Sequence, residues 1–389
     1  MKTTKKFKPF QLAAFAMMAA ILLFQPLSSS AKEKECLDPE PPKEQTIMLA
    51  LLLDTSNSMD GLIDQAKSQL WKIVNELAAA KCGDGSRPNI KIALYEYGND
   101  RLSSSEGYIR QVSPLTTDLD VISEKLFSLT TNGGEEYCGH VIRTSLNQLA
   151  WSSSNADLKM IFIAGNEPFT QGGVSFRLAC SLAKEKDVVV NTIYCGEFSE
   201  GMRTEWKTGA DITGGTYMSI EQDRKTVYIA TPYDEKIEAM NGRLNDTYVY
   251  YGASGSYKKE QQGKQDDNAG SYSMSNKVER AISKSSHAYT NSTWDLVDAS
   301  KDNEKAILDA DEKDLPKEMK GMTGEQRKSY VSQKSKERKS IQAEIQSLNQ
   351  KRQQYLNDNT PNDVKDTMLD AVMINAIKAR AKTKNMSWK

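Results

Sequence analysis

LLLDTSNSMDG, residues 51–61, is the stretch that decides the fold of the first half of the chain. Three leucines lead into the carboxylate of Asp54, and two hydroxyl side chains follow it at Ser56 and Ser58. A continuous apolar run of this kind predicts a strand that is buried on both faces of a parallel sheet. The oxygen-bearing side chains would then lie at the carboxyl end of the strand, where open α/β sheets bind ligands.

Strands and helices are predicted to alternate after this first strand. Short apolar segments indicate strands, and apolar residues at every third or fourth position indicate helices. The alternation predicts an α/β fold with a doubly wound, mostly parallel sheet flanked by helices. The expected strands are residues 46–53, 89–97, 108–112, 158–164, 188–194 and 216–220, and the expected helices are residues 62–77, 119–129, 140–151, 176–186 and 205–212.

Composition divides the chain into five segments. We expect a signal peptide (1–31), a lead-in (32–45), the α/β domain (46–222), an amphipathic helical extension (223–257) and a charged α-helical tail (258–389). Residues 252–275 are rich in Gly, Ser, Gln and Lys, which is typical of a linker. Residues 324–356 predict the longest helix, which would pair with residues 363–381 in a hairpin that packs on the α/β domain or frays.

The first residues have the pattern of an export signal. A lysine-rich start precedes an uncharged, mostly apolar run over residues 12–24, and residues 29–31 offer small side chains for cleavage. An uncleaved membrane anchor is the alternative, but this run is shorter than the roughly 20 residues that span a bilayer. We therefore expect an exported bacterial protein, periplasmic or secreted, with no stable membrane span after cleavage.

The overall charge argues against a nucleic-acid partner. The chain carries 51 Lys and Arg against 52 Asp and Glu, for a formal net charge of −1. Proteins that bind nucleic acid usually carry a clear basic excess. No nucleic acid is therefore expected among the partners.

Export would also permit disulfide bonds. Cys36 precedes the first strand and Cys82 follows the first helix, which places both at one end of the predicted sheet. Cys138 and Cys195 would lie at the other end. We expect the pairs Cys36–Cys82 and Cys138–Cys195 and a free Cys180 in the core, although spacing alone does not fix connectivity.

The oxygens of Asp54, Ser56 and Ser58 suit a hard divalent cation. Mg²⁺ takes six oxygens in near-octahedral geometry and usually keeps several waters. The alternative is that one serine only caps the helix that begins near residue 61. Capping does not explain a carboxylate directly after an apolar strand, where an unpartnered charge would be costly. We therefore favour a metal site.

The sequence DTSNS (54–58), between an apolar strand and an amphipathic helix, resembles the metal-ion-dependent adhesion site of von Willebrand factor A (VWA) domains. The resemblance covers residues 46–220. It implies Ser56 and Ser58 as direct ligands of Mg²⁺, with Mn²⁺ or Ca²⁺ as alternatives, and Asp54 as a direct or water-mediated ligand. It also implies an open coordination position for an acidic group of a partner.

Two loops depart from the family pattern. Where the second loop normally offers a threonine after glycines, this chain has Glu135 and Glu136. Where the third loop normally places an aspartate, it has Gly165, followed by Asn166 and Glu167. The metal site is either lost or rewired, with Glu135, Glu136 and Glu167 supplying the missing oxygens. Charge favours rewiring, because three crowded acids without a cation would repel one another.

The function expected from this pattern is non-catalytic, divalent-cation-dependent binding at the bacterial cell envelope. The partner would present an acidic group on a protein or a glycan, and the rim of the site would include Asn57, Asn132 and Asn166. One alternative is a scaffold that acts through its helical tail without bound metal. A less favoured alternative is a metal-dependent hydrolase, for which the sequence offers neither a nucleophile elbow nor an HExxH motif.

Overall fold

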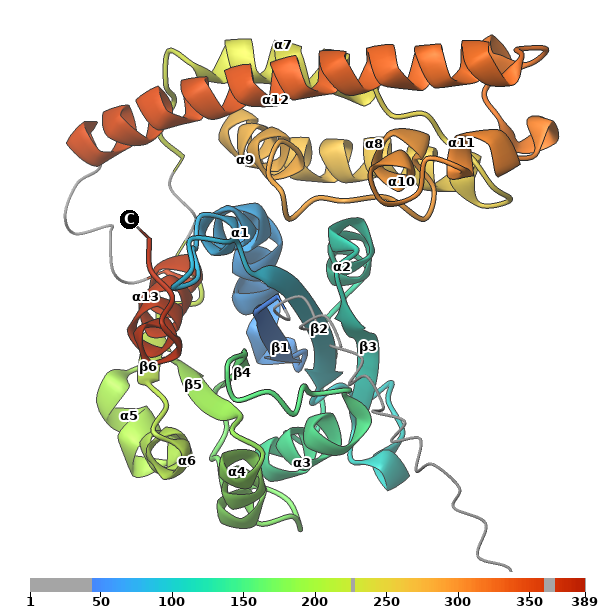
Figure 1. The fold of residues 1–389 in the computed structure, drawn as a ribbon. Helices are drawn as coiled ribbons and strands as arrows, with labels where there is room; N and C mark the ends of the chain where they lie inside the picture. Colours follow the sequence, from blue (N-terminus) through green and yellow to red (C-terminus); the bar gives the residue numbers. More distant parts are fainter. Residues whose placement is uncertain (1–43, 225–227, 360–367, 389) are drawn as a thin grey trace, which may run out of the picture. The chain divides into compact units, whose positions relative to one another are not determined.

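A six-stranded sheet organises the first half of the chain (Figure 1). The computed structural model describes residues 44–224, 228–359 and 368–388. The strand order is β3-β2-β1-β4-β5-β6, and only β3 runs antiparallel to its neighbour. The strands are β1 Thr46–Asp54, β2 Asn89–Tyr97, β3 Ile109–Thr116, β4 Leu158–Gly165, β5 Val189–Cys195 and β6 Tyr217–Ile220. The predicted fold class is confirmed.

Helices cover both faces of this sheet because its central strands are apolar on both sides. Along β1, Leu49, Leu51 and Leu53 join one core, whereas Ala50 and Leu52 join the other. The first core lies under α1 (Asp60–Ala78) and α2 (Leu119–Phe127), and the second lies over α3 (Cys138–Gln148), α4 (Phe176–Glu185) and α6 (Trp206–Thr213). A short helix that the sequence did not predict, α5 (Phe198–Arg203), follows β5.

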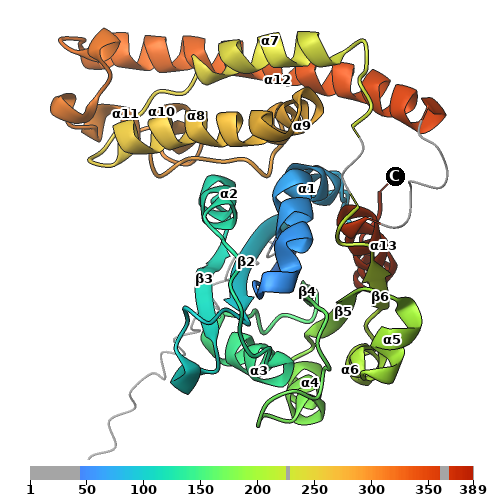
Figure 2. The same ribbon diagram turned by 180° about the vertical axis from the view of Figure 1, so that it is seen from behind.

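After β6, the described residues form helices joined by turns and loops. Their helices are α7 Asp234–Asn245, α8 Gly255–Tyr272, α9 Met274–Lys284, α10 Leu296–Asp302, α11 Ala306–Asp309, α12 Gly324–Asn359 and α13 Leu369–Ala381. Helix α12 packs along α7 and α9, and α9 packs on α1 (Figure 2). None of the helices within the described residues is long and apolar enough to cross a membrane. The expected signal peptide and Cys36 lie outside the described residues.

Buried ion pairs join these polar helices, which explains how they pack with few apolar residues. Arg280 pairs with Asp120 at 2.6 Å and with Asp266 at 3.0 Å, and Lys284 pairs with Asp266 at 2.8 Å. Arg338 and Arg352 are also fully buried and bind carboxylates from neighbouring helices.

Two expectations for this region are wrong. Residues 252–275 are not a linker, because α8 occupies most of them and buries the amides of Gln262 and Gln265. The long helix also forms no hairpin with the last one, since α13 packs on α1 and β4 instead.

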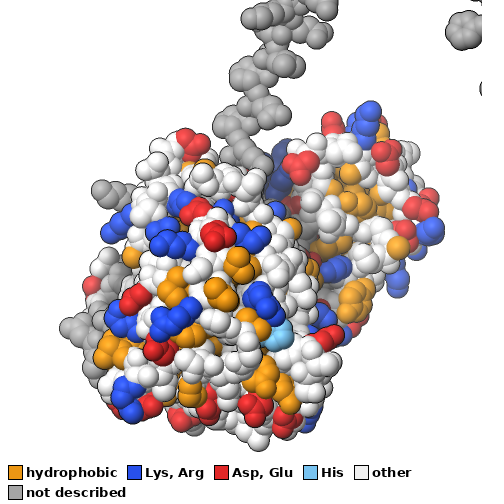
Figure 3. Space-filling view, turned by 90° about the horizontal axis from the view of Figure 1, so that it is seen from below, with side chains coloured by type: hydrophobic (Ala, Val, Ile, Leu, Met, Phe, Trp, Pro, Cys, Tyr) orange, Lys and Arg blue, Asp and Glu red, His pale blue; other side chains and the backbone are white. Residues whose placement is uncertain are grey.

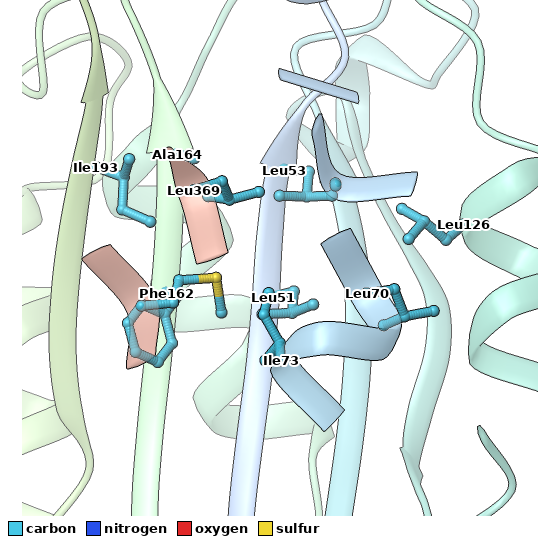
Figure 4. A pocket seen from close by; sticks show the side chains of 11 residues that line it. Leu51, Leu53, Leu70, Ile73, Leu126, Phe162, Ala164, Ile193 and Leu369 are labelled. Atoms are coloured by element: carbon cyan, nitrogen blue, oxygen red, sulfur yellow. The ribbon is translucent and has the colours of Figure 1, made fainter. Parts of the chain in front are cut away.

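Helix α13 completes the first core although it lies near the end of the chain. Its first two backbone N–H groups, at Leu369 and Asp370, donate to the side-chain oxygens of Gln65 and Gln69 on α1 at 3.2 and 2.7 Å. Leu369 points toward Leu53 across an apolar cavity of about 20 Å³ (Figure 4). The α/β fold is therefore finished by a segment far from it in sequence.

The predicted disulfide between Cys138 and Cys195 is wrong. Both thiols are free and buried, and so are those of Cys82 and Cys180. Cys138 belongs to the second core, between the sheet and α3, whereas Cys195 belongs to the first core on the opposite face of the sheet. The sheet separates the two side chains, so they cannot meet. The free, buried state expected for Cys180 is confirmed.

Candidate functional site

The first loop of the site holds Asp54, Ser56 and Ser58 together at the end of β1. Asp54 is fully buried, and its Oδ1 accepts a hydrogen bond from the backbone N–H of Ser56 at 2.7 Å. The hydroxyl oxygens of Ser56 and Ser58 lie 3.2 Å apart. Neither the short 3₁₀ turn Asn57–Met59 nor α1 has a side-chain cap. The capping explanation for these serines is therefore wrong, and their hydroxyls face the site.

The second loop brings the carboxyl group of Glu136 to Asp54. Glu136 is 4% exposed, and its backbone N–H donates to Gln171 Oε1 at 2.7 Å. Both carboxyl groups pack against Gly98, where a β-carbon would lie 2.7 Å from Asp54 Oδ1 and 2.8 Å from Glu136 Cγ. Gly98 also has a φ of +77°, which favours glycine. A glycine is thus needed here for the two acids to share one site.

This carboxyl pair has oxygens without partners. Asp54 Oδ2 and Glu136 Oε2 are buried and accept no hydrogen bond from the described residues. Burial is the main cause that raises the pKa of Asp54 well above its ordinary value of 3.8, and the nearby carboxyl group of Glu136 raises it further. Burial also raises the pKa of Glu136, whereas hydrogen bonds with Asp54 and Ser56 lower it in part, as expected if a protonated Asp54 donates to Glu136. The pair therefore needs either a proton or a cation to neutralise it.

The third loop contributes an amide and no buried carboxylate. Asn166 Nδ2 donates to Ser58 Oγ at 3.1 Å. At Gly165, a β-carbon would lie 2.6 Å from Tyr97 Oη and 3.2 Å from Asp54 Oδ2. Tyr97 Oη donates to the carbonyl oxygen of Ala164 at 2.9 Å, which fixes it in that position. The tyrosine thus fills the space that an aspartate at residue 165 would need.

The structure brings together only some of the predicted site residues. Asp54, Ser56, Ser58, Glu136 and Asn166 converge, as the contacts above show. The others lie at the edge: Glu135, Asn57 and Glu167 are exposed, and Asn132 contacts the first loop through its backbone N–H, which donates to Thr55 O at 2.9 Å.

Sequence reasoning missed Tyr97, Gly98, Gln171 and Gln222, which shape or brace the site. Gln222 Nε2 donates to the carbonyl oxygen of Ser58 at 2.8 Å and so holds the first loop. Tyr97 ends β2 beside the end of β1, and Gly98 follows it. The sequence did offer one indication of their role, because an aromatic residue followed by glycine stands at the end of the predicted second strand, at Tyr97 and Gly98.

These residues fit a hard divalent cation. No group of three or more His, Cys, Asp or Glu side chains that could hold a metal occurs within the described residues. The donors would instead be two serine hydroxyls and the carboxylates of Asp54 and Glu136, whose unpartnered oxygens a cation would satisfy. Such a set would leave coordination positions for water or a ligand.

Comparisons with known proteins agree with this domain assignment. Residues 49–219 match the family model of the von Willebrand factor type A domain. No curated protein matches the chain. One solved structure that matches is the conserved hypothetical protein BatB from Bacteroides thetaiotaomicron, at 17% identity with a TM-score of 0.34; the match covers 45% of this chain and 90% of that chain. Another is the SpRpn10 VWA domain, at 16% identity with a TM-score of 0.33; the match covers 45% of this chain and 88% of that chain.

A further match is proximal thread matrix protein 1 from the mussel byssus with a zinc-occupied MIDAS motif, at 15% identity over 46% of this chain and 43% of that chain, with a TM-score of 0.36. The family match and the six-stranded, mostly parallel sheet identify residues 49–219 as a von Willebrand factor type A domain.

Proposed function

We propose that this chain is a non-catalytic binding module that holds a divalent cation between Asp54, Ser56, Ser58 and Glu136. The observation that carries the proposal is the buried Asp54–Glu136 pair with its two unpartnered oxygens. A pair of this kind, placed at the carboxyl ends of parallel strands, is costly unless it is neutralised. Mg²⁺ is the first candidate, and Mn²⁺ or Ca²⁺ are the alternatives.

The bound cation would present an open position to an acidic group on a protein or glycan partner. Ser58 and Asn166 stand at the exposed side of the site and would border that group. We propose no catalytic role, because His140, the histidine nearest in sequence, lines a different hollow on the surface. A hydrolase would need a free base beside the cation, whereas the carboxylates of Asp54 and Glu136 would serve as its ligands.

Calorimetric titration of Mg²⁺, Mn²⁺ and Ca²⁺ into the metal-stripped chain tests the proposal. We expect saturable binding that Asp54→Ala abolishes and Glu136→Gln weakens at least about tenfold. Glu135→Gln is the matched control, because Glu135 carries the same charge one residue away but is exposed. No heat from the folded wild-type chain at millimolar metal would reject the proposal and favour the scaffold alternative.

Export to the cell envelope is a second part of the proposal. It rests on the lysine-rich and apolar start of the chain, which lies outside the described residues. Cell fractionation and N-terminal sequencing should find a mature chain that starts near Lys32. An intact N-terminus in the membrane fraction would instead indicate an anchor.

A further inference from the structure

Five exposed carboxylates surround the proposed metal site. They come from the start of α1, the turn after β2, the second loop, the third loop and the segment after β6, which contribute Asp60, Asp100, Glu135, Glu167 and Asp223 in that order. None of the five forms an ion pair with another described residue. We call these five residues the acidic rim.

Two members of the acidic rim lie beside the start of α1. Asp60 begins this helix shortly after Ser58, and its Oδ1 accepts a hydrogen bond from the hydroxyl group of Thr131. At Gly61, a β-carbon would lie 3.0 Å from Asp223 Oδ1. Both carboxylates therefore stand beside the loop that carries the two serines of the site.

The other three members adjoin the loops that complete the site. At Gly133, a β-carbon would lie 3.3 Å from Asp100 Oδ2 and 3.5 Å from Asn57 Nδ2, so Asp100 stands beside the residue between the two serines. Glu135 and Glu167 each adjoin, in sequence, a residue whose side chain reaches the site. Exposed negative charge therefore borders the site on these loops as well as at α1.

A hollow of about 280 Å³ adjoins the rim at Asp60. Its polar lining consists of Asp60, Asp64, Lys67, Thr130 and Thr131. The one ammonium group in this lining, that of Lys67, already donates to the carbonyl oxygen of Leu129 at 3.0 Å. Two carboxylates therefore share one committed cation, which leaves a place for a basic side chain of a ligand.

The negative charge of the rim is local. The whole chain has a formal net charge of −1, and Figure 3 shows basic and acidic side chains interspersed on the side seen from below. At the rim, five carboxylates face two nearby cations, Arg101 and Lys67, which leaves an excess of at least three negative charges. A bound Mg²⁺ would not remove this excess, because Asp54 and Glu136 would match its two charges.

This charge restricts the ligand. The five acids do not converge on a second cation, since no group of three or more His, Cys, Asp or Glu side chains that could hold a metal occurs within the described residues. A polyanion would be repelled by them, whereas a carboxylate between basic side chains would bind the cation and the rim together. The buried, unpartnered oxygens of Asp54 and Glu136 mark where that carboxylate approaches.

We propose that the partner is a protein whose contact segment carries one carboxylate between basic side chains. The carboxylate binds the cation, one basic side chain enters the hollow beside Asp60, and another pairs with the acidic rim. This inference rests on the proposed function, because the carboxylate needs the bound cation. It selects a protein over an acidic glycan as the partner.

The probes are three acetylated and amidated peptides, Ala-Lys-Asp-Lys-Ala, Ala-Gln-Asp-Gln-Ala and Ala-Lys-Asn-Lys-Ala, and trigalacturonic acid as an acidic glycan. Each is titrated into the full chain with saturating Mg²⁺, and Kd is read from amide chemical shifts. At about 0.1 M NaCl, the Lys-Asp-Lys peptide should bind at least about fivefold more tightly than the other two peptides. The glycan should bind more weakly than the Gln-Asp-Gln peptide. At about 1 M NaCl, where charges are screened beyond roughly 3 Å, the advantage of Lys-Asp-Lys over Gln-Asp-Gln should fall below about twofold.

Two double variants test the rim itself. Asp100→Asn/Asp223→Asn removes two of its charges and should weaken binding of the Lys-Asp-Lys peptide at least about threefold without weakening that of the Gln-Asp-Gln peptide. Glu185→Gln/Asp302→Asn is the matched control, because it removes two exposed acids at the carboxyl ends of α4 and α10. Circular dichroism checks that each variant is folded, and calorimetry checks that it binds Mg²⁺.

The two proposals fail in different ways. If the folded chain binds no Mg²⁺, both are overturned. If Mg²⁺ binds but no peptide does, if Lys-Asp-Lys has no advantage over Gln-Asp-Gln, if the glycan binds more tightly than Lys-Asp-Lys, or if the two double variants have equal effects, only this inference is overturned. It is also overturned if Lys-Asp-Lys binds equally well in EDTA, or no better than Lys-Asn-Lys, because the acids would then attract cations without the metal.

Discussion

Tyr97 Oη lies 2.6 Å from the position that a β-carbon would take at Gly165. The residue at the end of β2 therefore decides which residue can stand at the end of β4. The carboxylate that the VWA pattern places at residue 165 is absent for a steric reason, and Glu136 approaches Asp54 from the second loop instead.

Replacing Gly165 with aspartate should not restore the family pattern. The new β-carbon would collide with Tyr97 Oη, and we expect a loss of about 1–3 kcal/mol in urea denaturation and no gain in Mg²⁺ affinity. Gly173→Asp is the control, because its β-carbon would meet nothing within 4 Å. In Tyr97→Phe/Gly165→Asp the collision is removed and metal affinity should rise; unchanged affinity there would contradict this account.

Gly98→Ala should disrupt the carboxyl pair. Its methyl group would press on Asp54 Oδ1 and Glu136 Cγ, and we expect at least tenfold weaker metal binding by calorimetry. Gly85→Ala is the control for backbone strain, since Gly85 has a similar φ of +85° and open space around its β-carbon. Equal losses in the two variants would assign the effect to strain alone.

The stability of the metal-free chain should fall as pH rises. When folding raises the pKa of a carboxyl group, its ionisation destabilises the folded state. This cost to the free energy of unfolding is absent below the pKa of the unfolded chain and is complete above the pKa of the folded chain. For Asp54, stability starts to fall near pH 3.8, the ordinary pKa of an aspartate, and stops falling at the raised pKa of the folded chain.

Glu136→Gln should therefore stabilise the metal-free chain at pH 8 by about 1–3 kcal/mol and flatten its pH dependence between pH 4 and pH 8, as measured by urea denaturation. Glu135→Gln should change neither quantity. If the free energy of unfolding of the wild-type chain rose between pH 4 and pH 8, this mechanism would be wrong.

Asp266→Asn should destabilise the helical part strongly. Burial alone would raise the pKa of Asp266, but Lys284 and Arg280 lower it well below 3.8. Its contribution is therefore present above pH 3.8 and is lost as pH falls through the lowered folded pKa. Removing the charge leaves two buried cations short of a partner and should cost about 3–5 kcal/mol at pH 7. Asp267→Asn is the neighbouring control.

Much of the α/β domain was predictable because its strands are apolar on both faces. The bounds predicted for β2 match those observed, and those of β1 and β4 differ by one residue at the carboxyl end. Strand β3 was predicted too short, because its exposed polar residues and Pro114 weaken the apolar pattern. Its antiparallel direction depends on pairing, which periodicity does not encode.

The helical region and part of the site were not predictable from pattern alone. Helix α8 has almost no apolar stripe, because its buried residues are mostly amides and an aspartate that bonds to cations on α9. Glu135 and Glu136 are equivalent in sequence, and only the bend of their loop decides that Glu136 turns inward. Such choices follow from long-range contacts that a single sequence does not display.

The contact of α13 with α1 also has a consequence for synthesis. The first core of the VWA domain stays open on one side until residues 369–381 have been made, long after its own strands have emerged. Leu51, Leu53 and Phe162, which line the cavity that α13 closes, would be exposed to other chains during that interval. Nascent chains halted before residue 369 should thus require protection from aggregation. That requirement should end once α13 has been made and has packed on α1.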